Sequence, residues 1–180
     1  MRILIILASV LLSACTVVAP NYQVSLDNTQ KLKLASLNKM DVGTIKDSKK
    51  VNKLSLRGSS FVSPIEKSFG KYLESALKQE LEQAKLYSSV SNIQVEGVLL
   101  KNNIDISGFS IGEGDMTVKF TVKQDEKVTY QKTLSAKHEW DSSFVGAVAI
   151  PNGQINYPVI IQKLLGELFT DPEFIAATQA

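Results

Sequence analysis

The chain of 180 residues has little of the chemistry that marks most metal, nucleic-acid and membrane-spanning proteins. It contains one cysteine and one histidine, which excludes an internal disulfide and argues against a thiolate or imidazole metal cluster. Its formal net charge of +2 gives no electrostatic footprint for nucleic acid. The apolar stretch from Ile3 to Leu12 is too short for a membrane-spanning helix, which needs about 20 residues. We therefore expect a domain stabilised by its apolar core, with no metal and no cofactor.

The single cysteine, Cys15, closes a short N-terminal signal. Arg2 supplies a positive charge, an apolar stretch follows, and small side chains occupy positions 13 and 14. This pattern is typical of a secretory signal peptide. The alternative is an ordinary signal cut nearby that leaves Cys15 as a free thiol, which is a liability in an oxidising compartment.

The tetrapeptide from Leu12 to Cys15 resembles the lipobox of bacterial lipoproteins. The resemblance implies that residues 1–14 are removed and that Cys15 carries a diacylglycerol and an amino-terminal acyl chain such as palmitate. Two or more chains anchor a protein stably to a bilayer. Thr16 stands where an aspartate would retain such a protein in the inner membrane. The resemblance therefore implies a periplasm-facing outer-membrane protein, or a cell-membrane protein in a Gram-positive host.

The remaining chain predicts one domain behind a short tether. Residues 15–30 contain a proline and few large apolar side chains, as expected of a lipidated tether. Residues 31–180 are long enough for a single core. Apolar spacing predicts a strand with a bulge over 32–45 and a second strand over 51–56.

The clearest predicted helix starts at Ser63. Ser63 and Glu66 form a capping box around a proline at the first helical position. Apolar residues then recur at helical spacing as far as Ala84, with charged residues on the opposite face. Glu74 and Lys78 have the spacing of an i,i+4 ion pair. The apolar face requires a sheet to cover it.

Alternating apolar and polar residues predict that sheet. The pattern gives three strands with one buried face, over 93–100, 116–123 and 128–140. Residues 124–127 are predicted to form a hairpin turn, a second helix is expected from Pro158, and Asp171 is expected to cap a last turn. The order β-β-α-β-β-β-α predicts the α+β class, an antiparallel sheet with both helices packed on one face.

This order behind a lipobox resembles the small periplasmic lipoproteins of the YajG type and the auxiliary lipoproteins of ABC-type lipid transporters. It also resembles the periplasmic domain of lipoprotein activators of peptidoglycan synthases. Those proteins are binding or assembly factors, so the resemblance implies a non-catalytic role by analogy. It transfers no functional residue beyond Cys15.

Candidate catalytic residues are sparse. His138 lies near Asp141, Ser142 and Ser143, but neighbours at the end of a strand point in different directions, which favours a packed histidine over a triad. The glycine-rich stretch 107–115 precedes a strand, whereas phosphate loops precede a helix, so a flexible connection is favoured. We predict no catalytic residue and no enzyme activity.

The most unusual segment is an apolar run after the last strand. Phe144, Val145, Val148 and Ile150 lie where a polar connection is expected, so they either close the core or form a surface for a partner or ligand. A filled core with a surface patch, or an exposed sheet edge, would favour binding of another envelope protein. The predicted function is therefore a membrane-anchored accessory or binding factor in envelope assembly or transport. The alternative is a carrier of a lipid or other apolar ligand, which requires a lined cavity.

Overall fold

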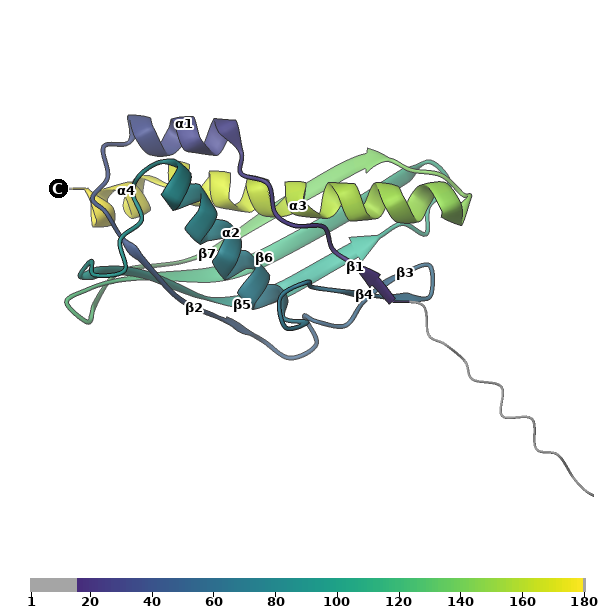
Figure 1. Ribbon diagram of the computed structural model, residues 1–180, viewed down its shortest axis with the longest axis horizontal. Helices are drawn as coiled ribbons and strands as arrows, with labels where there is room; N and C mark the ends of the chain where they lie inside the picture. The colour runs from purple at the N-terminus through teal and green to yellow at the C-terminus, as the bar shows by residue number, and fades with distance from the viewer. Residues whose placement is uncertain (1–15, 180) are drawn as a thin grey trace, which may run out of the picture.

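A four-stranded sheet forms the larger layer of the computed structural model, which describes residues 16–179 (Figure 1). Its strands lie in the order β2-β5-β6-β7 and span Asp41–Asp47, Ile93–Asp105, Ile111–Gln124 and Lys127–Asp141. Strands β5, β6 and β7 are the predicted antiparallel meander. Strand β2 runs parallel to β5, because the chain between them is long enough to cross over and includes a helix.

A second, three-stranded sheet lies at one end of the molecule. Its strands span Thr16–Val18 (β1), Leu54–Leu56 (β3) and Ser59–Val62 (β4), in the order β1-β4-β3. Strands β3 and β4 form a hairpin whose turn residues, Arg57 and Gly58, have φ angles of 51° and 84°. Strand β1 pairs with β4 in parallel.

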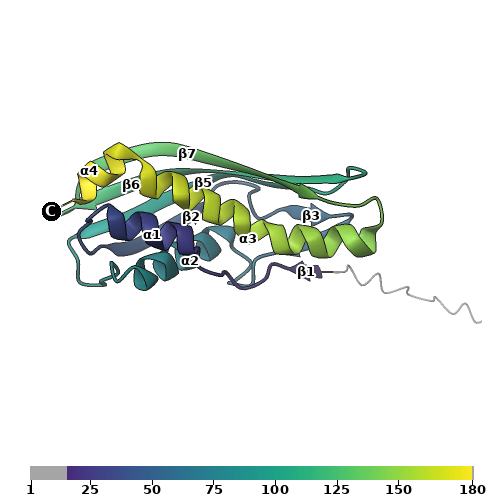
Figure 2. The same ribbon diagram turned by 90° about the horizontal axis from the view of Figure 1, so that it is seen from above.

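The helices lie on one side of the larger sheet (Figure 2). They are Leu26–Leu34 (α1), Phe69–Gln83 (α2), Gly146–Thr170 (α3) and Pro172–Thr178 (α4). Alternate residues of β6 point toward them and are buried, including Met116, Val118, Phe120 and Val122. The α+β class and the packing of helices on one face of the sheet are therefore confirmed.

The hairpin between β6 and β7 forms where the sequence predicts it. Asp125 and Glu126 both have positive φ angles, of 49° and 64°, as a two-residue type I′ turn requires. The register shifts between Val122 and Lys123, which places Tyr130 opposite Val122. Val128 consequently lies in solvent, although the sequence pattern groups it with the buried side chains of β7.

The tether predicted for residues 15–30 is wrong over its described part, residues 16–30. Strand β1 pairs with β4, and Ala19 and Tyr22 are buried. The backbone here has partners in the fold, because β4 offers an unpaired edge and Glu80 accepts a 2.6 Å hydrogen bond from the Tyr22 hydroxyl. Cys15 and the predicted signal peptide lie outside the described residues.

The strand predicted over 32–45 is also wrong in its first half. Leu32 belongs to α1, whose N-cap is Ser25, and the Ser25 hydroxyl accepts a hydrogen bond from the Asn28 amide. Strand β2 begins only at Asp41. It carries the predicted bulge, as a register shift between Val42 and Ile45.

Helix α2 begins later than predicted. Glu66 and Lys67 have positive φ angles, so the helix cannot pass through them, and Ser68 replaces Ser63 as the N-cap. Glu74 does not pair with Lys78. Its carboxylate instead accepts a 3.1 Å hydrogen bond from the Ile45 amide, which joins α2 to β2.

Helix α3 begins earlier than predicted, at Gly146 rather than Pro158, and Pro151 and Pro158 both lie inside it. An internal proline costs a helix about 3 kcal/mol. Packing outweighs that cost, because one face of this helix of 25 residues is buried on the sheet from Ala149 to Phe169. No helix within residues 16–179 combines the length and the hydrophobicity needed to cross a membrane.

Candidate functional site: an exposed apolar end

Apolar side chains gather in solvent where the β5–β6 loop, the β7–α3 junction and the β3–β4 turn meet. Phe109, Phe144, Val145 and Val148 are 78%, 62%, 57% and 47% exposed. We call these four residues the apolar end. Single exposed apolar side chains are ordinary on a protein surface, whereas a contiguous group marks a contact site.

The two phenylalanines form the centre of the apolar end. Their ring centroids are 5.2 Å apart and the rings are nearly parallel, at an angle of 14°. The guanidinium carbon of Arg57 lies 5.7 Å from the centroid of the Phe144 ring, within cation–π range. The aromatic pair is therefore held in a stack without being covered.

Arg57 also ties the surrounding loops together. Its Nη2 donates to the backbone oxygens of Gly108 and Ser143, at 3.1 Å in each case. In the β5–β6 loop, the Asp105 carboxylate accepts a 2.8 Å hydrogen bond from the Ser107 amide. This bond lowers the pKa of Asp105, and the positive charge of Arg57 lowers that pKa further. These hydrogen bonds hold the backbone of the loops that carry the apolar side chains in one conformation.

The structure divides the four residues that the sequence singles out. Phe144, Val145 and Val148 are exposed, whereas Ile150 is half-buried and packs against the core. The division follows from helical geometry, because Val148 lies on the outer face of the first turns of α3 and Ala149 on the inner face. Sequence reasoning missed Phe109, whose signal was a lone aromatic residue in a loop of glycine and serine.

The exposed apolar surface continues along α3 toward the first described strand. Val148 and Ile155 are two turns apart on one face of the helix, and Ile155 is exposed. The Gln154 side chain donates a 2.9 Å hydrogen bond to the backbone oxygen of Val18, which is also exposed. Strand β1 therefore lies beside the outer face of α3.

His138 contacts residues of α3 rather than a serine and an aspartate. The Lys163 ammonium lies 2.9 Å from Nδ1 and has only donors, so Nδ1 is the acceptor. Nε2 then carries the proton and donates to the Asn156 side-chain oxygen at 3.0 Å. Within residues 16–179 no three histidine, cysteine, aspartate or glutamate side chains gather in a metal-binding cluster.

The glycines of the stretch 107–115 serve packing. The flexible connection predicted over 107–115 is wrong in its second half, because residues from Ile111 onward belong to β6 and pair with β5 and β7. A Cβ atom at Gly112 would lie 2.5 Å from the Trp140 indole nitrogen, and one at Gly114 would lie 2.3 Å from the Ile160 side chain. Glycine at these positions lets α3 and the Trp140 side chain approach the sheet.

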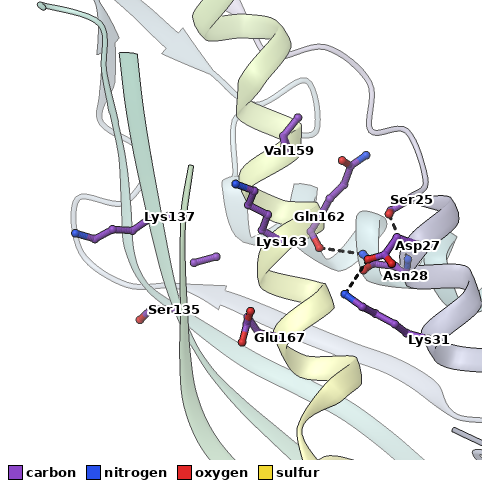
Figure 3. Close-up of a pocket in the computed structure, with 11 residues that line it drawn as sticks. Ser25, Asp27, Asn28, Lys31, Ser135, Lys137, Val159, Gln162, Lys163 and Glu167 are labelled. Carbon is purple, nitrogen blue, oxygen red and sulfur yellow. Dashed lines mark hydrogen bonds and ion pairs between the residues drawn. The ribbon is translucent and has the colours of Figure 1, made fainter. Parts of the chain in front are cut away.

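A polar hollow of about 450 Å³ lies between α1, α3 and β7 (Figure 3). One wall is closed by the Asn28 amide, which donates to the backbone oxygen of Gln162, and by the Lys31–Asp27 ion pair. Lys163 and Glu167 of α3 face the same space, whereas the Lys137 side chain points away from it (Figure 3). A second, open hollow of about 310 Å³ is lined by Leu34, Phe169 and Ile175 among others.

Comparisons with known proteins show a fold but not a family. No family model and no curated protein matches the chain. A Xanthomonas campestris protein of family DUF330 is similar in structure, with 11% identity, a TM-score of 0.57, and coverage of 86% of this chain and 92% of that one. A Chlamydia trachomatis protein gives 11% identity and a TM-score of 0.51 over 79% of this chain and 99% of that one.

A minor lipoprotein from Acinetobacter baumannii is a weaker match. It has 16% identity and a TM-score of 0.42, covering 76% of this chain and 91% of that one. At these identities a structural likeness establishes the fold alone, and function must be argued from the residues of the site.

Proposed function

We propose that the chain is a lipid-anchored protein of the bacterial envelope that acts as a non-catalytic accessory or binding factor. The observation that carries the proposal is the apolar end, a fixed group of exposed apolar side chains over a filled core. The lipobox motif that ends at Cys15 is the basis of the proposed location in the envelope. Cys15 is the proposed lipidated residue, and Thr16 after it favours the periplasmic face of the outer membrane.

The packing of the core favours this role over that of an apolar-ligand carrier. A carrier needs an apolar cavity that encloses most of its ligand. Here the space between the small sheet, α2 and α3 is occupied by fully buried aromatic side chains, with Tyr157 at 5.1 Å from both Phe61 and Phe69 between ring centroids. The 450 Å³ hollow is lined mainly by polar and charged groups.

Substitution of the cysteine tests the anchor. Cys15→Ser removes the sulfur that would carry the diacylglycerol, so the protein should leave the membrane pellet and appear in the soluble envelope fraction. Intact-mass measurement of the wild-type protein should show the added acyl groups. An unmodified thiol, or a Cys15→Ser protein that still pellets with membranes, would contradict the proposal.

A matched variant tests the choice of membrane. Thr16→Asp keeps the lipid but places the inner-membrane retention residue after it. The lipidated variant should therefore move from the outer-membrane to the inner-membrane fraction in a density gradient. An unchanged distribution would contradict the assignment to the outer membrane. It would not contradict the lipid anchor.

A further inference from the structure

We infer that the apolar end rests on the bilayer that holds the lipid of Cys15, so its partner is the membrane interface rather than an envelope protein. The inference rests on the proposed function, because it takes Cys15 as the anchored residue. It names the occupant of the apolar end and fixes how the domain stands on the membrane.

The first step is the absence of a tether between the proposed anchor and the fold. Thr16 already belongs to β1 and is paired with Ser60. Cys15 directly precedes Thr16 in the sequence, so a single peptide bond joins it to the strand. A lipid on Cys15 is therefore attached directly to the small sheet, and the end of the domain nearest to it must face the bilayer.

The second step places the apolar end on that same side. Strand β1 runs parallel to β4, so Thr16 lies beside the start of β4, two residues after the turn at Gly58. The neighbouring turn residue, Arg57, holds the loops that carry Phe109 and Phe144. Figure 1 shows the start of β1 and the first turns of α3 at the same end of the molecule.

The third step is the chemistry of this end. Apolar and aromatic side chains partition into the boundary between headgroups and acyl chains, about 5–10 Å into the membrane. Arg57 shares the end with the carboxylates of Asp105, Glu113 and Asp141, so these four groups carry a net negative charge that does not attract anionic lipids. The contact is apolar, and we expect it to weaken as the anionic lipid content rises.

Hydrogen–deuterium exchange of the lipidated protein tests this orientation. The protein is placed in vesicles of phosphatidylethanolamine and phosphatidylglycerol and compared with the Cys15→Ser protein in solution. Amides of residues 107–110 and 143–148 should exchange more slowly on the vesicles. The turn at Asp125 and Glu126, at the opposite end of β6, should exchange equally in both samples.

Paired serine substitutions assign any protection to the apolar side chains. Phe109→Ser with Phe144→Ser should remove the protection in the lipidated protein. In the Cys15→Ser background each substitution should lower vesicle partitioning on the order of tenfold, the effect of leaving one such side chain in water. Leu34→Ser with Val90→Ser is the matched control, since both residues are exposed apolar side chains away from this end.

The outcomes separate this inference from the proposed function. Lipidated protein whose exchange is unchanged on vesicles would overturn the inference and leave the anchor intact. Protection that appears only in native membranes, and not in pure lipid, would overturn it in favour of a protein partner. Absence of lipid on Cys15 would overturn the proposed function itself.

Discussion

The two ends of the molecule differ in which groups are exposed and which are buried. At the apolar end, aromatic rings lie in solvent and the hydrogen bonds of Arg57 fix the loops beneath them. At the other end, where α1, α2 and α4 meet the C-terminal half of α3, polar groups are buried and their hydrogen bonds hold helices together. The difference is consistent with the contact proposed for the first end and with a stabilising role for the second.

Glu80 is the centre of the buried polar network. Its side chain is fully buried, and one carboxylate oxygen accepts hydrogen bonds from the Tyr22 hydroxyl at 2.6 Å, the Ser25 amide at 2.9 Å and the Asn28 side chain at 3.3 Å. Burial raises the pKa of Tyr22, and the nearby Glu80 raises it further, so the phenol keeps its proton and remains a donor. This network holds residues 22–28 against α2.

The largest expected effect comes from breaking this network. Glu80→Ala removes the acceptor of two buried side-chain donors and of the half-buried Ser25 amide, and it should lower the free energy of unfolding by about 3 kcal/mol. Glu80→Gln keeps a side-chain acceptor and should lose less. Urea denaturation of the two variants measures both effects, and equal losses would show that the acceptor is not what stabilises this end.

A smaller, pH-dependent effect is expected at Asp171. Burial raises the pKa of its carboxyl, but the Lys132 ammonium and the amides of Phe174 and Glu173 outweigh burial, and the net shift is downward. The stability gained from the ionised carboxylate is therefore present above the unfolded-state pKa of about 3.9, and it is lost as the pH falls through the lower folded-state pKa.

Asp171→Asn tests that linkage. Because Lys132 is partly exposed and its ion pair is screened, the variant should be about 0.5–1 kcal/mol less stable than the wild type at pH 7. The difference should narrow below about pH 4, where the Asp171 carboxyl of the unfolded wild-type chain begins to take up a proton. Urea denaturation at several pH values measures it, and a gap that is constant with pH would exclude the carboxylate charge as its source.

The smallest effect on stability is expected at the apolar end. Phe144→Asp places a charge on an exposed side chain, so the free energy of unfolding should change by no more than about 0.5 kcal/mol, while contact with the membrane or a partner is lost. Vesicle binding and crosslinking in the native envelope measure the contact.

Ala149→Asp is the control for this variant, from the buried face of the same helix turns. It places a carboxylate in the core and should cost several kcal/mol. If Phe144→Asp destabilises the protein to a similar degree, Phe144 belongs to the core and the comparison between the two ends fails.

The pattern of neighbouring residues predicts those elements in which one face is buried along the whole length of the element. Strands β5, β6 and β7 alternate between a buried and a polar face, and Asp171 caps α4 as expected, since its carboxylate accepts from the first two free amides. The start of α3 could not be predicted in the same way. Gly146, Pro151 and Pro158 disfavour a helix locally, and burial on the sheet outweighs that preference.

The apolar end was only partly predictable for a related reason. Phe144, Val145 and Val148 form a run that stands out in the sequence, and their exposure follows once the run is helical. Phe109 lies 35 positions earlier, and only the pairing of β6 with β7 and the bonds of Arg57 place it on Phe144. A contact between loops has no periodic signal along the chain.

The sequence by itself determined the amphipathic strands and the α+β class, because these depend on the composition and spacing of neighbouring residues. The tertiary structure alone decided that residues 16–30 pack onto the domain, that α3 runs through two prolines, and that apolar residues from separate loops share one end. Each of these depends on partners distant in the chain: the edge of β4, the buried face of the sheet and the guanidinium of Arg57. Packing and hydrogen bonding between distant segments outweigh local preference at these positions.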